Sequence, residues 1–195
     1  MQLLRLYLQR INRINSVNQK RIQIIGIGNG GCNIVSNLAR QAEDELYVLC
    51  DMEEIGVKHT DNCKTVIFDK DILSSPSDSS HLYGQVIEKQ ADLVFVIACL
   101  GGCFGTETTP LFVKESLKAG KRTIGIVTLP FQQEGDMTHD KSLDALRKIA
   151  ANTDSMFILN NHYLEKHHSE KYFLEAIKEA DNIIGRIIST LKLLF

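Results

Sequence analysis

The chain has 195 residues, with 22 lysines and arginines against 24 aspartates and glutamates, giving a net charge of −2. This length predicts one domain with a sizeable core, and the near-neutral charge excludes a sequence-wide basic field that would recruit nucleic acid. No run of about 18 apolar residues occurs, so no membrane span is expected. The cysteine count is five, an odd number, which indicates reduced thiols and a cytoplasmic protein.

The first predicted element is an amphipathic helix within residues 1–20, where Leu4, Leu8, Ile11 and Ile14 recur at helical spacing. Such a helix packs on the flank of a domain, and its arginines leave open a contact with a partner or a membrane surface. Residues 21–195 are expected to form the domain itself.

Strands and helices alternate through this domain. The expected strands are 21–27, 45–50, 65–68, 93–98, 123–128 and 155–159, and the expected helices are 33–41, 81–90, 110–119, 139–150 and 171–194. This alternation predicts a doubly wound, mainly parallel sheet with helices on both faces, a Rossmann-like α/β fold. Ligands of such folds bind at the carboxyl ends of the strands.

Two glycine-rich segments each follow a predicted strand. The first, residues 26–31, reads Gly-Ile-Gly-Asn-Gly-Gly and fits G-x-G-x-x-G, with Asp51 ending the next strand 20 residues later. This pattern is also the fingerprint of a dinucleotide site, which keeps an NAD- or FAD-binding oxidoreductase open as an alternative.

The second segment, residues 101–106, reads Gly-Gly-Cys-Phe-Gly-Thr and follows the strand at 93–98. Backbone N–H groups in such a turn, with a helix dipole behind them, suit phosphate oxygens. Two such turns predict a nucleotide whose phosphates are held from two sides. The chain contains no G-x-x-x-x-G-K-[ST], so a P-loop site is excluded.

Four segments in order resemble the nucleotide-binding domain of FtsZ, the bacterial cell-division GTPase related to tubulin. Residues 28–33 resemble its first glycine loop, and residues 101–107 resemble the tubulin signature G-G-G-T-G-T-G. Residues 128–135 resemble T-x-P-F-x-x-E-G, and residues 154–161 resemble the family's D-S-…-N-D segment. The ordered series is more specific than either glycine loop alone.

The resemblance implies a site for GTP or GDP, with room for a magnesium ion. Glu134 is expected at the ribose, and Asp181 and Asn161 near the guanine. No catalytic residue and no protein metal ligand is predicted. With the end of the second strand included, the candidate cofactor-binding residues are Gly28, Asn29, Gly30, Asn33, Asp51, Gly101, Gly102, Gly105, Thr106, Glu134, Asn161 and Asp181.

Several positions depart from the family pattern. Phe104 removes a hydroxyl, and Glu107 adds a negative charge near the expected phosphates, where two like charges at ~4 Å repel by about 4 kcal/mol at an intermediate dielectric. Glu107 must therefore point away, be neutralised or weaken binding. Residues 180–182 read Ala-Asp-Asn where the family has A-N-D. The acid and the amide are thus exchanged, which argues against the family's selectivity for guanine.

Two parts of the family's chain are not expected here: the next segment, which carries the acidic residue that activates water in the adjoining subunit's site, and the second domain that follows it. The resemblance therefore implies a guanine-nucleotide-binding module with little or no hydrolysis alone, linked to cell division or filament regulation. The isoleucine-rich final helix predicts burial against the sheet, a second copy or a full-length FtsZ-like partner. The alternatives are a GTPase completed by another chain, a decayed domain that binds no nucleotide, and the oxidoreductase.

Overall fold

The computed structural model describes residues 21–41, 45–52, 63–76, 78–161 and 173–192. The helix predicted within residues 1–20 lies outside these ranges. Within them, one parallel sheet has the strand order β3-β2-β1-β4-β5-β6. The strands are β1 (Ile22–Ile27), β2 (Leu46–Asp51), β3 (Cys63–Ile67), β4 (Leu93–Cys99), β5 (Arg122–Leu129) and β6 (Ser155–Asn160). This order is that of a Rossmann-type doubly wound sheet, so the predicted fold class is confirmed.

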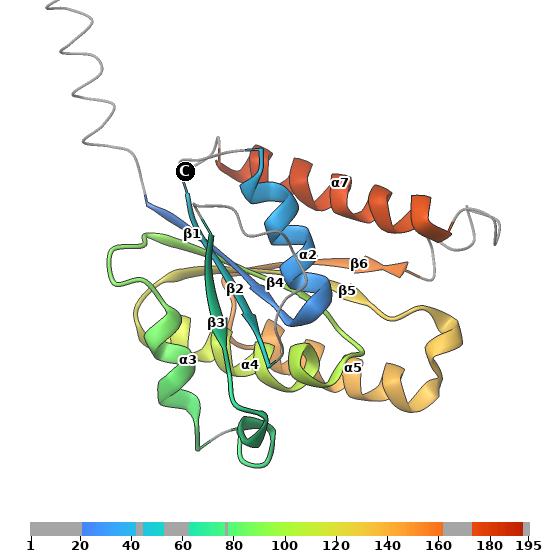
Figure 1. Cartoon of the computed structure of the whole chain (residues 1–195), viewed down its shortest axis with the longest axis horizontal. Coiled ribbons are helices and arrows are strands. Elements are labelled where there is room, and N and C mark those ends of the chain that lie inside the picture. Colours follow the sequence, from blue (N-terminus) through green and yellow to red (C-terminus); the bar gives the residue numbers. More distant parts are fainter. Residues whose placement is uncertain (1–20, 42–44, 53–62, 77, 162–172, 193–195) are drawn as a thin grey trace, which may run out of the picture.

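Helices cover both faces of the sheet (Figure 1). On one face lie α2 (Gly28–Ala39) and α7 (Phe173–Lys192), and on the other lie α3 (Ser80–Val86), α4 (Cys103–Lys118) and α5 (Asp136–Ala150). Two short 3-10 helices, η1 (Lys70–Leu73) and η2 (Gln132–Glu134), occupy connections. Because the central strand β4 is covered on both faces, its residues from Leu93 to Ala98 form an unbroken buried run.

The final helix turns its apolar side to the sheet. Ile184 and Ile188, one turn apart, are 0% and 2% exposed, and Ile187 and Leu191 pack partly buried against the same cluster. The expected burial of the helix is confirmed for these residues, and the sheet and α2 together provide it. Leu194 and Phe195 lie outside the described ranges. No helix among the described residues combines the length and apolarity needed to cross a bilayer.

Two helices begin five or more residues before the predicted start. Helix α2 begins at Gly28 instead of residue 33, and α4 begins at Cys103 instead of Pro110, which lies inside the helix. Glycine is a weak helix former and proline favours the first helical turn, so propensity placed both starts too late. Tertiary packing decides otherwise, because a Cβ at Gly31 would lie 2.4 Å from the Ile97 carbonyl oxygen. The glycines are what let the first turn of α2 rest on β4.

Candidate functional site

The candidate site lies at the carboxyl ends of β1 and β4, where the strand order of the sheet reverses. Neighbouring strands β1 and β4 send the chain into α2 on one face and α4 on the other, so the two helices begin on either side of the same strand ends. The two starts touch: a Cβ at Gly28, whose φ is +70°, would lie 3.3 Å from the Gly105 nitrogen. A cleft of about 740 Å³ opens at this point.

Both helices present free N-terminal donors to this cleft. Neither Ile27 nor Gly102, the residues that precede the first turns, makes a side-chain cap, and neither first turn contains an acidic residue. The first N–H groups of a helix have no intrahelical partner. An anion placed between α2 and α4 would therefore meet donors and positive dipole ends from two helices at once.

Ten of the twelve predicted site residues line the cleft, which gathers them from five elements and two connections. They are Gly28, Asn29, Gly30, Asn33, Asp51, Gly102, Gly105, Glu134, Asn161 and Asp181.

The other two predicted residues, Gly101 and Thr106, are not among the lining residues and bond to each other. The Gly101 N–H donates to Thr106 Oγ1 at 2.8 Å, and the Thr106 N–H donates to the Gly102 carbonyl at 3.1 Å. Thr106 is only 6% exposed. These bonds hold the turn in shape, so both residues support the wall of the cleft from behind.

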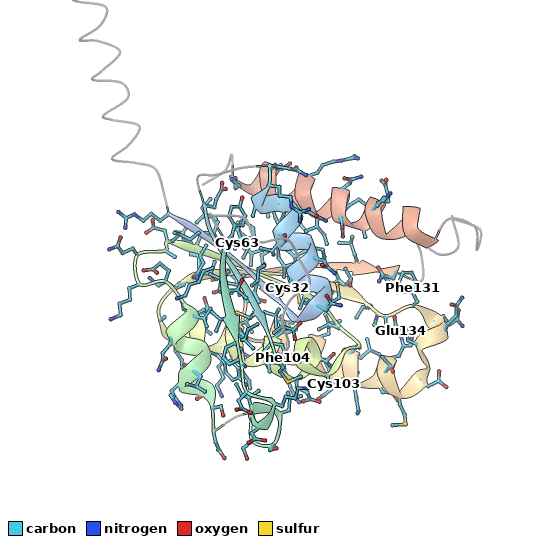
Figure 2. The ribbon with its side chains drawn as sticks, in the orientation of Figure 1. Cys32, Cys63, Cys103, Phe104, Phe131 and Glu134 are labelled. Atoms are coloured by element: carbon cyan, nitrogen blue, oxygen red, sulfur yellow. The ribbon has the colours of Figure 1, made fainter. Side chains whose placement is uncertain are left out.

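The departures in the second glycine segment fall in different places (Figure 2). Phe104 is 4% exposed, and its ring centre lies 5.6 Å from that of Phe68, so it anchors the first turn of α4 in the core. Cys103 is exposed and lines the cleft. Glu107 is exposed and is not among the lining residues, so of the three outcomes expected for it, the structure shows that it points away.

Three carboxylates line the cleft, and each accepts a hydrogen bond from the protein. Asp51 Oδ1 accepts from the Met52 N–H at 2.8 Å, and Glu134 Oε1 accepts from the Phe131 N–H at 2.8 Å. Asp181 Oδ2 accepts from the side-chain amide of Asn37 at 3.4 Å.

Burial is the main influence on the ionisable groups deeper in the cleft. It raises the pKa of Asp181, against the bond from Asn37 that lowers it. At the floor, burial raises the pKa of the Cys99 thiol, a bond with Thr128 lowers it, and the charges of Asp181 and Glu134 raise it further. The floor thiol is therefore held in its neutral form.

The comparisons with known proteins agree with this geometry. A family model described as "Tubulin/FtsZ family, GTPase domain" matches residues 78–169. The cell division protein FtsZ of Aquifex aeolicus (strain VF5) is 26% identical over 187 residues, which cover 88% of this chain and 51% of the relative. FtsZ of Helicobacter pylori (strain ATCC 700392 / 26695) is 26% identical over 184 residues, covering 87% of this chain and 48% of the relative.

Residues 78–169, just under half of the chain, thus match the GTPase domain of the Tubulin/FtsZ family. Among solved structures, an empty FtsZ dimer from M. jannaschii matches with a TM-score of 0.78 at 22% identity, covering 94% of this chain and 58% of that one. A GDP-bound monomer of CetZ1 from Haloferax volcanii matches with a TM-score of 0.69 at 16% identity, covering 88% and 60%. The chain spans about half the length of the curated relatives it matches. None of these matches favours the oxidoreductase alternative.

Ten further residues line this cleft that were not among the predicted site residues. They are Ile34, Met52, Cys99, Leu100, Cys103, Phe104, Thr128, Pro130, Phe131 and Ala180. Cys99 ends β4 and Thr128 is the penultimate residue of β5. The rule that ligands bind at the carboxyl ends of parallel strands would have selected both.

The carboxylates of the cleft are the kind of ligand that magnesium prefers, but they are not grouped for it. Among the described residues no three ligating side chains lie together in a way that could hold a metal ion. A magnesium ion in this cleft would therefore take most of its ligands from groups other than these side chains.

Proposed function

We propose that this chain is a guanine-nucleotide-binding module of FtsZ type, which holds GDP or GTP in the cleft between α2 and α4. The convergence of two uncapped helix starts on one cleft carries the proposal. In it the phosphates take the N–H groups of residues 28–30 and 103–105, and a magnesium ion accompanies the nucleotide. A cytoplasmic location and a link to cell division or filament regulation belong to the same proposal.

The base is assigned to the end of the cleft formed by Asp181 and Asn161. Guanine carries an N1–H and a 2-amino group on one edge, and a carboxylate, which only accepts hydrogen bonds, complements both. Adenine lacks this pair of donors. The exchange of acid and amide at residues 181–182 therefore supports guanine selectivity in our proposal, because it places the carboxylate in the cleft.

The ribose is assigned to Glu134. One of its carboxylate oxygens accepts the Phe131 N–H, which fixes the side chain beside the cleft. A carboxylate retains acceptor capacity after one such bond and can receive a ribose hydroxyl.

Binding is tested by thermal shift and calorimetry with GDP, GTP, ATP and NAD, each with and without magnesium. A nucleotide at about 100 times its dissociation constant stabilises the protein by about 2.7 kcal/mol, which for a chain of this size raises Tm by about 5–10 °C. We expect shifts with GDP and GTP. No shift with any nucleotide would favour the decayed domain, and a shift with NAD alone would favour the oxidoreductase.

We further propose that the chain alone hydrolyses little GTP and that it associates with itself or with a full-length FtsZ-like partner. Phosphate release measured over a wide range of protein concentration tests this. A rate per chain that stays at background throughout supports the binding module. A rate per chain that rises steeply with concentration shows instead a GTPase completed by a second chain.

A further inference from the structure

Helices α2 and α7 lie side by side on one face of the sheet (Figure 1). Their contact is close, because a Cβ at Gly185, one turn after Asp181, would lie 3.4 Å from Leu38 Cδ2. Asn37 precedes Leu38 and reaches across this contact, where its Nδ2 donates to Asp181 Oδ2 at 3.4 Å. A residue outside the cleft lining thus holds a residue that lines it.

Asn37 is itself held by Arg40 on the same helix. The Arg40 guanidinium donates to Asn37 Oδ1 at 3.2 Å. Arginine can only donate and an ionised aspartate can only accept, so an amide, which does both, can join them in one orientation. With its oxygen turned to Arg40, the amide must present its N–H to Asp181.

We propose that Asn37, oriented by Arg40, positions the Asp181 carboxylate to read the guanine base. Both are positioning residues, and their role rests on the proposed function of the cleft. One oxygen of Asp181 is fixed by the amide, and the carboxylate keeps further acceptor sites for the N1–H and 2-amino groups. Specificity for guanine thus depends on α2, which contributes N–H donors for the phosphates at its start and orients the Asp181 carboxylate from near its end.

The hydrogen bonds from Arg40 to Asn37 and from Asn37 to Asp181, here called the relay, also set the pH range in which guanine is recognised. The pKa of Asp181 is raised by burial and lowered by the bond from Asn37, so removing the amide leaves burial unopposed. Among the described residues, the groups that reach Asp181 from packed elements are Cys99 of β4 and, through Asn37, Arg40 of α2. On α7 itself the charged neighbours are Lys178, Glu179 and Arg186. Guanine reading requires ionised Asp181, so it fails as pH falls through this raised pKa.

Asn37→Asp is the sharpest variant, because it keeps the size of the side chain and its partner Arg40 but turns an acceptor toward Asp181. Asn37→Ala removes the relay altogether. Gln41→Asp introduces the same charge at the exposed end of α2, one turn away, and serves as the matched control. Melting temperatures without nucleotide verify that all variants are folded.

Affinities for GDP and for inosine diphosphate, which lacks the 2-amino group, are measured from pH 5 to pH 8. We expect the wild-type protein to prefer GDP by about tenfold, since a hydrogen bond to a charged acceptor is worth about that factor. Asn37→Asp should weaken GDP binding by about tenfold or more and remove the preference. Both Asn37 variants should move the acid limb of GDP binding to higher pH, and Gln41→Asp should match the wild type.

A carboxyl carbon NMR titration of Asp181 without nucleotide provides a second readout, in which both Asn37 variants should raise the pKa. Unchanged GDP preference together with an unchanged Asp181 titration would overturn the positioning role while leaving the proposed function intact. Wild-type protein that binds no GDP would overturn the proposed function, and the guanine-reading role with it.

Discussion

The way in which α2 rests on the sheet makes Gly31→Ala the most informative substitution. Gly31 lies in the first turns of the helix, and a Cβ there would meet the Ile97 carbonyl oxygen at 2.4 Å and the Ala98 Cα at 3.3 Å. Ordinary contact begins near 3.4 Å, so the helix or the strand must move by about 1 Å. Ile97 is fully buried and pairs with strands on both sides, so the strand is held in place.

The magnitude follows from two opposing effects. Overpacking of a buried contact costs about 1–3 kcal/mol or more, and replacing glycine by alanine inside a helix returns about 1 kcal/mol. Because the overlap is about 1 Å and the strand is held in place, the cost lies in the upper half of that range. We therefore expect a net loss of about 1–2 kcal/mol in the free energy of unfolding, or about 2–8 °C in Tm for a chain of this size. Urea unfolding without nucleotide measures the free energy directly.

Gly102→Ala is the matched control, because its new Cβ has no heavy atom within 4 Å and its φ is −73°. The backbone there already suits alanine, which by itself would stabilise the protein by up to about 1 kcal/mol. Because Gly102 precedes the first turn of α4, where alanine is a poorer cap than glycine, this gain is offset and we expect a change near zero. If the two variants unfolded within about 0.5 kcal/mol of each other, the scatter of ordinary surface substitutions, the contact between α2 and β4 would be wrong.

Three further outcomes are expected. Burial raises the pKa of Asp181, so protonated Asp181 stabilises the native state fully below its ordinary pKa of 3.8, and this stabilisation is lost as pH rises through the raised pKa. Asp181→Asn should therefore stabilise the nucleotide-free protein at pH 7 but not at pH 3. Urea unfolding at both pH values measures this difference. The Tyr83 hydroxyl is fully buried, has no hydrogen-bond partner among the described residues and has its pKa raised by burial to about 12; Tyr83→Phe should raise the unfolding free energy by about 1 kcal/mol, and a loss of that size would reveal a partner. Cys103 is exposed in the cleft, whereas Cys32 and Cys50 are buried and the partly buried Cys63 lies outside the cleft lining. N-ethylmaleimide followed by peptide mass spectrometry should label Cys103 first, and saturating GDP should slow that reaction but not the labelling of Cys63; equal protection of both thiols would contradict the assigned site.

Much of the fold could be predicted because its signals are local. An apolar run such as residues 93–98 reads as a buried strand from its own side chains, and the alternation of strands and helices fixes the sheet class. The glycine segments were placed correctly at strand ends. Their helical character was missed, because the propensity of glycine and proline argues against helix where packing requires it.

In the candidate site, too, the residues were predicted from local motifs, whereas their exact placement was not. Ten of the residues chosen from motifs line one cleft, since motif positions at strand ends converge on one edge of a parallel sheet. Gly101 and Thr106 fall behind the wall, because the hydrogen bond between them is a product of the turn that no residue pattern records. Glu107 points away because the helix begins before it, which rotates its side chain off the cleft.

The sequence by itself determined the α/β class, the two glycine segments and the family resemblance, since each depends on residues close together in the chain. Only the tertiary structure decided that the two helix starts touch at Gly28 and Gly105, leaving their donors to one cleft. It alone brought Asn37 to Asp181, a pair 144 residues apart. Contacts of that kind depend on how helices settle on a twisted sheet, and the packing of side chains, not their order, sets that arrangement.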